Sequence, residues 1–353
     1  MLAKAARAAG FTPLVIDAYG DADTRAAAAE HRRLHFRGPV IDMVRLGADL
    51  ESLENRYGRP PICWGSGWES SGHLLRALAC RYRILGSSPR ALLGLARPGW
   101  HDSLRSSDFA KPDFSLFAAE SEFLVKDRCR AGGYGVDFSH GQVFLPAHQY
   151  RQRFIKGESL SVLCCARGEE VAVIGWSEHF NLQSSAQWPF RHSAVITRPA
   201  VPCNANFLGS LTAAAKKLGL SGLFGADLII DGEDELTIVE INPRPTASVP
   251  LHLNLREAFK LHIQPELSAS LPAQSVTQRS RANAVVYADS PIRVTNELNW
   301  PPWVSDVPSD TRPYADGEPL CSIRAEAADV EAVKRLLEKR LEELLAMFQN
   351  EYV

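Results

Sequence analysis

The stretch GADLIIDGEDELTIVEINPR, which runs from Gly225 to Arg244, decides the fold. Two apolar runs, LII and TIV, flank a polar segment, a pattern typical of two strands joined by a turn. An antiparallel hairpin of this length returns its end to its beginning, so Asp227 and Glu240 are expected to face each other. Glu240 and Asn242 are two residues apart and therefore share one face of the second strand.

This hairpin is predicted to gather three hard oxygen donors, two carboxylates and one amide. Mg²⁺ takes few protein carboxylates and shares its shell with phosphate oxygens, and Arg244 can pair with phosphate or carboxylate oxygens. The sequence therefore predicts a site that holds Mg²⁺ between nucleotide phosphates. The competing interpretation is a surface hairpin with ordinary turn polarity. It is disfavoured because the apolar strands would bury charged ends that then need a cation or a partner.

Size and composition restrict the class of protein. The chain has 353 residues, of which 45% are hydrophobic and 23% charged, enough for two or three packed units. A net charge of −2 gives no basic surface for nucleic acid, and no apolar run reaches the roughly 18 residues of a membrane span. We therefore expect neither partner. Seven scattered cysteines without a CxxC pair, and no signal-peptide pattern, indicate reduced thiols in a cytoplasmic protein.

The first hundred residues alternate strand and helix patterns, which is typical of a parallel α/β layer. The chain opens inside what reads as the first crossover helix, LAKAARAAG, with no strand or glycine-rich turn before it. Since the first strand of a doubly wound unit is central, we expect the sheet to lack one strand, or the natural protein to start further upstream. The next helix is expected at 23–34, with Asp23 as its cap.

Lys126 ends a strand-like segment and is followed by a glycine-rich turn, KDRCRAGGYGV. Glycines allow backbone amides to approach phosphates closely, and the lysine adds a positive charge. The turn therefore predicts a phosphate contact, although its spacing matches neither the P-loop nor the dinucleotide-binding motif. A salt bridge is the competing interpretation for Lys126. The glycines concerned are Gly132, Gly133 and Gly135.

The segment YRQRFIKGESLSVLC, at 150–164, supplies a second candidate contact. A strand at 152–155 is expected to lead through Gly157 and Glu158 into another strand. Such a linker can offer backbone groups to the edge of adenine and a carboxylate to ribose hydroxyls. Alternatively, Glu158 is an exposed turn residue.

The order of these segments resembles the ATP-grasp superfamily over nearly the whole chain, and the terminal motif EINPRP is the most specific part of the match. The resemblance implies an α/β plus α+β fold with an N-terminal parallel α/β (pre-ATP-grasp) domain, here lacking its first strand, and two lobes that hold ATP between them. A polar segment at 99–112 predicts the first domain junction. The expected units are an N-terminal α/β domain at 1–105, a small lobe at 106–165, a large lobe with the metal site at 166–260, and a C-terminal α+β tail at 261–353.

The resemblance also implies roles for individual residues, with ATP and Mg²⁺ as ligands. Lys126 contacts the phosphates, and Arg244 steadies the acyl phosphate or the substrate. The other implied roles are a glycine loop over the phosphates (Gly132, Gly133, Gly135), a hinge that binds adenine (Phe154, Ile155), a ribose carboxylate (Glu158) and metal ligands (Asp227, Glu240, Asn242).

Within the superfamily the chain resembles carboligases related to biotin carboxylase, including ligases that join glutamate to tyramine or tyrosine in methanofuran-type cofactor synthesis. The segments that carry this resemblance include GSGWE, YRQRFIKGESLSV and EINPRPTAS. It implies ATP- and Mg²⁺-dependent formation of an amide from a small-molecule carboxylate and amine, through an acyl phosphate. Two alternatives stay open: a carboxylase like biotin carboxylase, and an ATP-binding module without turnover.

Two positions depart from the family pattern. Arg153 stands where the hinge often carries a glutamate. A second phosphate lysine is usual near the domain junction, where only Lys111 is present, so Arg97 is a candidate substitute.

Glu69, Asp21 and Asp23 follow strands and could orient a substrate. One of His179 and His192 could meet phosphate, although loop or core placement is favoured.

Overall fold

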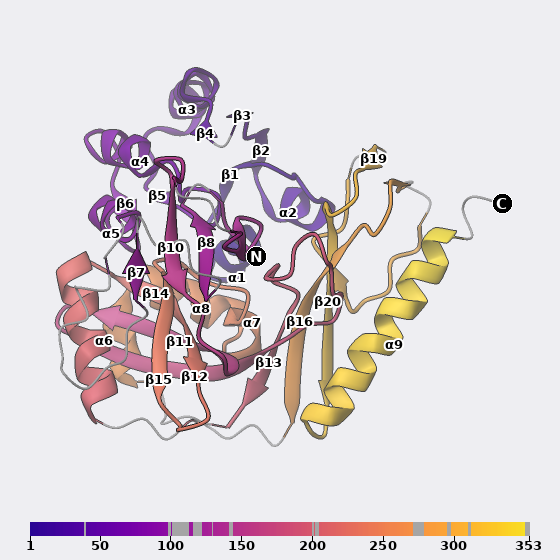
Figure 1. Ribbon diagram of the computed structural model, residues 1–353. Helices are drawn as coiled ribbons and strands as arrows, with labels where there is room; N and C mark the ends of the chain where they lie inside the picture. The colour runs from indigo at the N-terminus through magenta and orange to yellow at the C-terminus, as the bar shows by residue number, and fades with distance from the viewer. Residues whose placement is uncertain are drawn as a thin grey trace.

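The computed structural model describes residues 1–38, 40–97, 100, 113–115, 122–128, 130–140, 144–199, 201, 205–270, 279–294, 298–309 and 312–349. A large antiparallel sheet forms its base, with a smaller sheet and an N-terminal α/β layer above it (Figure 1). The predicted junction at 99–112 lies outside the described residues except for Trp100. None of the helices in these ranges is long and apolar enough to cross a membrane.

The N-terminal layer alternates helices and strands, as the sequence predicted. Its strands β1 and β2 pair in parallel, as do β5 and β6. The elements are α1 (Leu2–Ala8), β1 (Leu14–Asp17), α2 (Ala22–Ala27), β2 (Glu30–Arg33), β3 (Phe36–Arg37), β4 (Val40–Ile41), α3 (Met43–Tyr57), β5 (Ile62–Cys63), α4 (Gly72–Ala79), β6 (Ile84–Leu85) and α5 (Pro89–Leu95).

The prediction of a helix at 23–34 is wrong for the second half of that range. α2 ends at Ala27, and Glu30–Arg33 forms β2 because its backbone pairs with β1. Tertiary pairing here overrides the weak helical preference of the segment. The cap is also two residues earlier than predicted: Asp21 Oδ1 accepts a hydrogen bond of 2.8 Å from the Thr24 N–H. Asp23 instead pairs with Lys4 Nζ at 2.6 Å.

The parallel layer is split. The pairs β1–β2 and β5–β6 are two separate two-stranded sheets, and no strand among the described residues joins them. The opening residues form α1 rather than a strand. This arrangement agrees with the expectation that the layer lacks one strand.

The two halves of this layer are attached to different parts of the molecule. Next to β1, the Ala22 N–H donates to the Val307 carbonyl at 2.8 Å, and the Asp23 carboxylate accepts from the Val307 N–H at 3.2 Å. Before α5, the Ser88 N–H donates to the Gly219 carbonyl at 3.3 Å. The first half is therefore held by the C-terminal part of the chain, and the second by the turn that precedes β14.

The small sheet has the order β7-β10-β8-β9, all antiparallel. β8 presents Lys126 between Tyr150 of β10 and Val136 of β9, and the glycine-rich turn connects β8 to β9. Figure 1 shows this sheet between the N-terminal helices and the large sheet. Its strands are β7 (Phe114–Ser115), β8 (Phe123–Asp127), β9 (Val136–Phe138) and β10 (Gln149–Arg153).

The large sheet has eight antiparallel strands in the order β15-β14-β11-β12-β13-β16-β20-β18. They are β11 (Glu158–Arg167), β12 (Glu170–Phe180), β13 (Ala194–Arg198), β14 (Gly222–Ile230), β15 (Leu236–Asn242), β16 (Ser280–Tyr287), β18 (Val304–Ser305) and β20 (Pro319–Ala327). β11 is continuous across the expected boundary at 165/166, and the tail strands extend the same sheet. The division into four units remains a prediction.

Helices cover both ends of this sheet. α6 (Ala205–Leu218) buries Leu211 and Ala214 against β11 and β14, and α9 (Val330–Gln349) buries Val333, Leu337 and Leu344 against β16 and β20. The apolar stripe predicted for the last helix therefore packs in the core. The remaining elements are α7 (Val249–His252), α8 (Leu255–Ile263), η2 (Pro265–Ser270), β17 (Ile292–Arg293) and β19 (Pro313–Tyr314).

His262 at the end of α8 is locked in the core in its neutral form. Its side chain is 2% exposed, and Nδ1 accepts a hydrogen bond of 3.2 Å from the Leu223 N–H. A Cβ added to Gly86 would lie 2.4 Å from the ring, so the imidazole has no room to turn toward water. Burial lowers the pKa of His262 from 6.5 to about 4.

We expect the free energy of unfolding to fall as the pH is lowered from 6.5 to about 4, because the unfolded chain gains a proton that the folded His262 resists. His262→Gln keeps an acceptor for Leu223 and removes this titration. Between pH 6.5 and about 4, the unfolding free energy of His262→Gln should change less with pH than that of wild type. The two slopes should differ by up to about 1.4 kcal/mol per pH unit. Urea denaturation at stepped pH measures both slopes. The exposed His73→Gln is the control, and equal slopes for wild type and His262→Gln would show that the proton is taken up elsewhere.

Candidate functional site

The β14–β15 hairpin places Asp227 directly opposite Glu240, as the sequence predicted. The register shift comes after Asp227, and in the same register as the Asp227–Glu240 pair, Gly225 pairs with Asn242. Asn242 Nδ2 donates a hydrogen bond of 3.0 Å to Asp227 Oδ2. The hairpin is held rigidly because Ala226, Leu228 and other inward residues of its strands are fully buried. The three oxygen-bearing side chains therefore meet at one end of it.

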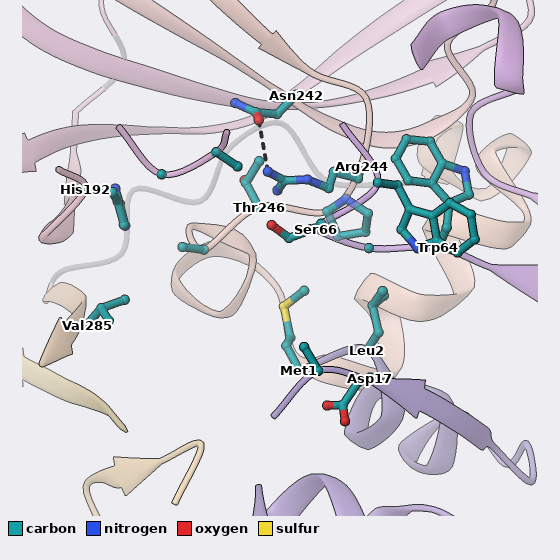
Figure 2. A pocket seen from close by; sticks show the side chains of 18 of the residues that line it. Met1, Leu2, Asp17, Trp64, Ser66, His192, Asn242, Arg244, Thr246 and Val285 are labelled. Carbon is teal, nitrogen blue, oxygen red and sulfur yellow. Dashed lines mark hydrogen bonds between the residues drawn. The ribbon is translucent and has the colours of Figure 1, made fainter. Parts of the chain in front are cut away.

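Arg244 links this group to the N-terminal layer. Its Nη2 donates to Asn242 Oδ1 at 3.1 Å and lies 3.0 Å from Glu69 Oε1. Figure 2 shows Arg244 reaching toward the loop that carries Trp64 and Ser66, with its hydrogen bond to Asn242 dashed. Glu69, considered from the sequence as a substrate contact, thus orients the arginine.

Lys126 belongs to the same electrostatic cluster as the facing carboxylates. The Glu240 side chain is exposed to a cavity but lies deep within it, away from bulk water. This loss of water raises the pKa of Glu240, and the charge of Asp227 raises it further. The charges of Lys126 and Arg244 lower it. Burial lowers the pKa of Lys126, while Glu240 and Asp227 raise it. Two carboxylates that repel each other, beside an amide oxygen, form a donor set that fits Mg²⁺.

These groups line one cavity of about 1440 Å³ between the two sheets and the N-terminal layer. In Figure 2 the N-terminal residues Met1, Leu2 and Asp17 lie across this cavity from Asn242. The predicted site residues on its wall are Lys126, Gly132, Gly133, Phe154, Ile155, Asp227, Glu240, Asn242 and Arg244.

Gly135 and Glu158 are not part of that wall. A Cβ on Gly135 would lie 2.6 Å from the Asp127 Cβ, so this glycine allows the turn to pack on its own strand. Glu158 is half exposed at the start of β11 and pairs with Arg198 Nη1 at 2.8 Å. Its predicted ribose contact would therefore compete with an existing ion pair.

The glycine loop is closed against the segment before β13. Gly132 and Gly133 have φ values of 69° and 80°, which favour glycine. The His192 N–H donates to the Gly132 carbonyl at 2.9 Å, and a Cβ on Gly133 would lie 1.9 Å from the Phe190 carbonyl oxygen. The loop can take this position because no side chain projects from Gly133.

The hinge carries an aromatic group that sequence reasoning found only in part. The Phe154 ring packs on Phe138 with centroids 5.4 Å apart, and Phe138 packs on Phe190 at 5.2 Å. Phe154 and Phe190 both line the cavity and offer apolar faces to a base. Phe190 was missed, although the run WPFRH could have indicated it. Arg153 is neutralised by Glu122 at 2.7 Å and Asp113 at 3.1 Å.

His179 and His192 line the cavity, where sequence reasoning favoured loop or core positions. His179 Nε2 lies 3.7 Å from Asp227 Oδ1, and the two rings meet edge-on at 5.7 Å. Burial, then the charges of His179 and Arg244, lower the pKa of His192 to about 4, so it is neutral at pH 7. Among the described residues, neither buried Nε2 atom has a hydrogen-bond partner. Arg97 is not on the cavity wall, and Lys111 lies outside the described residues.

Residues 101–248 match a family model described as the ATP-grasp domain. The chain therefore contains an ATP-grasp domain, and the fold class predicted from the sequence is confirmed. No curated protein sequence matches the chain.

Solved structures with the ATP-grasp fold are similar along nearly the whole chain. The L-amino acid ligase from Bacillus licheniformis has a TM-score of 0.70 and 12% identity, over 97% of this chain and 93% of that one. The biotin carboxylase domain of the 2-oxoglutarate carboxylase from Hydrogenobacter thermophilus, in complex with MgADP and bicarbonate, has a TM-score of 0.67 and 12% identity. The match covers 93% of this chain and 83% of that one. N5-carboxyaminoimidazole synthetase from Staphylococcus aureus has a TM-score of 0.66 and 16% identity, over 99% of this chain and 94% of that one.

Proposed function

We propose that the protein is an ATP- and Mg²⁺-dependent ligase that joins a carboxylate to an amine and releases ADP and phosphate. The observation that carries the proposal is the register pair Asp227–Glu240, electrostatically coupled to Lys126 and Arg244 on the wall of one cavity. The similar folds include a ligase, a carboxylase and a synthetase, which agrees with ATP-driven bond formation.

The chain would act by positioning and by neutralising charge. Asp227, Glu240 and the Asn242 oxygen would hold Mg²⁺, which when bound neutralises phosphate charge. Lys126 would neutralise the phosphates from the small sheet, and Arg244, fixed by Glu69, would face the transferring group from the other side. The aromatic faces of Phe154 and Phe190 would receive adenine.

The proposed reaction has two steps. A carboxylate oxygen of the acid attacks the γ-phosphorus as its bond to ADP breaks, which gives an acyl phosphate. The amine nitrogen then attacks the acyl carbon, phosphate leaves, and the nitrogen loses a proton to form the amide. Water would destroy the intermediate, so the loop of Gly132 and Gly133 would stay closed until the amine reacts.

The resemblance of the sequence to ligases that add glutamate to tyramine or tyrosine makes these compounds the first substrates to test. Addition of glutamate during synthesis of a methanofuran-like cofactor is the specific form of the proposal. It concerns the choice of acid and amine, not the site for ATP.

An ADP-release screen of amino acids, dicarboxylic acids and aromatic amines with Mg·ATP tests the function. We expect ADP only when an acid and an amine are both present.

Lys126→Met should lower kcat/KM for ATP about 100-fold, because it removes a charge-assisted phosphate contact from a desolvated site. Lys339→Met, in an exposed part of α9, is the control.

Two results would contradict the ligase. ADP release that requires bicarbonate and biotin would indicate a carboxylase. ATP binding in calorimetry without ADP from any pair would indicate a module that binds ATP without turnover.

A further inference from the structure

Arg191 lies among three aromatic side chains on the wall of the cavity. Its guanidinium carbon is 3.8 Å from the ring centroid of Tyr287 and 5.2 Å from that of Trp188. The Tyr134 ring stands edge-on to both, with centroids 5.9 Å from Trp188 and 6.1 Å from Tyr287. We call Tyr134, Trp188 and Tyr287 the aromatic box. The stacked cation is held in one orientation by ring faces.

The aromatic box is fixed by contacts other than those with Arg191. The Tyr134 hydroxyl donates to the Gly317 carbonyl at 2.6 Å, and the Tyr287 hydroxyl donates to the His192 carbonyl at 2.6 Å. A Cβ on Gly317 would lie 2.2 Å from the Trp188 ring, so the indole packs directly on that backbone. The guanidinium is therefore oriented before any ligand arrives, which reduces the entropy cost of binding.

The charge of Arg191 is not neutralised within the described part of the chain. No ion pair there includes it, its side-chain hydrogen bond is with the neutral Tyr134, and its Nε is buried without a hydrogen-bond partner. The nearby Glu318 is already paired with Arg312 at 3.0 Å. A partly buried, unpaired cation is costly, and a guanidinium is shaped to bind a carboxylate through two parallel hydrogen bonds. These features indicate an anionic ligand.

Arg191 and His192 are consecutive residues whose side chains have different neighbours. The charged groups that act on His192 are His179, Asp227 and Arg244, so His192 faces the hairpin. Arg191, the preceding residue, acts instead on Tyr134 and Tyr287, which also interact with Tyr19 from the N-terminal layer. Figure 2 shows His192 and Val285, which neighbour the aromatic box in the chain, on one side of the cavity. The Arg191 side chain thus lies on Tyr287, which interacts with Tyr19 of the N-terminal layer, whereas the Arg191 main chain lies beside Gly133 of the glycine loop.

We propose that Arg191 and the aromatic box bind a substrate carboxylate that the reaction does not consume. One substrate would then be a dicarboxylic acid or an α-amino acid, whose second functional group is the one that reacts. This inference rests on the proposed ligase function and specifies its substrate class. The activated carboxylate would lie at the hairpin and the spectator carboxylate at Arg191.

Calorimetric titration tests the inference without turnover. The protein is saturated with Mg²⁺ and a non-hydrolysable ATP analogue and titrated with succinate, L-glutamate and L-phenylalanine, each beside its amide. We expect at least one acid to bind about 10- to 100-fold more tightly than its amide, the difference a charge-assisted hydrogen-bond pair provides. Which acid shows the preference separates dicarboxylic acids from α-amino acids.

Arg191→Gln should abolish the preference for the acid, and Arg191→Lys should restore part of it, while affinity for the ATP analogue stays unchanged. Arg335→Gln, on the exposed face of α9, should behave as wild type. If no acid in the panel binds wild type more tightly than Arg191→Gln, the inference is wrong. A preference that persists without ADP release would contradict the ligase function but not the carboxylate site. ADP release with the same KM for the acid in wild type and Arg191→Gln would contradict the site alone.

Discussion

Replacing Glu240 with glutamine is expected to lower ATP turnover by about 10²- to 10³-fold and to leave the protein folded. The amide is a neutral and weaker ligand, so charge that develops on the transferring phosphoryl group loses part of its compensation. ADP release at saturating ATP, measured across a range of Mg²⁺ concentrations, gives the loss. Excess Mg²⁺ should restore only part of the rate.

The same substitution should raise the Tm of the protein without nucleotide. The folded-state pKa of Glu240 is raised by burial and by Asp227, so ionising it above pH 4.5 costs stability, and glutamine removes that cost. The gain in Tm should be present at pH 7 and shrink as the pH falls toward 4.5. Glu233→Gln, exposed in the turn of the same hairpin, is the control. Near wild-type turnover of Glu240→Gln, or a large fall in its Tm, would contradict the metal site.

Gly133→Ala is expected to raise the KM for ATP at least tenfold, because the new methyl group would lie 1.9 Å from the Phe190 carbonyl oxygen and the loop must lift. An open loop also admits water, so part of the acyl phosphate should hydrolyse and ADP should exceed amide. Steady-state kinetics at varied ATP, with both products counted, measures the two effects.

Gly132→Ala provides a matched control for this change. Its φ of 69° resembles the 80° of Gly133, so both variants carry a similar backbone strain of about 1 kcal/mol. Of the described residues, however, a Cβ on Gly132 would meet only the Tyr134 ring, at 3.9 Å. Equal rises in KM for both variants would mean that strain alone, and not contact with Phe190, controls the loop.

The sequence predicted those parts of the site that local geometry determines. The pairing of Asp227 with Glu240 follows from the length of one hairpin and the period of a strand. Lys126 was found because it lies in a strand that runs straight into a glycine turn. Within such short segments the spacing along the chain fixes the spacing in space.

Contacts between distant segments could not be predicted in this way. Glu69 reaches Arg244 across 175 positions of sequence, and no local pattern encodes that distance. The sequence of β2 alone predicts a helix, and the segment forms a strand because it pairs with β1. His179 and His192 meet at the cavity only because β12 and β13 are neighbours in the sheet. Glu158 has the expected residue type at the expected place in the chain, but Arg198 on β13 already pairs with it.

The split in the N-terminal layer makes the mouth of the cavity adjustable. Asp17 and Tyr19 belong to the half that is tied to Val307, whereas Trp64 and Trp68 belong to the half that is tied through Ser88 to Gly219. Because no main-chain hydrogen bond of the described residues crosses between β1 and β5, the two halves can separate or approach by repacking side chains alone. Substrates of different width could thus be accepted while the β14–β15 hairpin keeps its pairing in the large sheet.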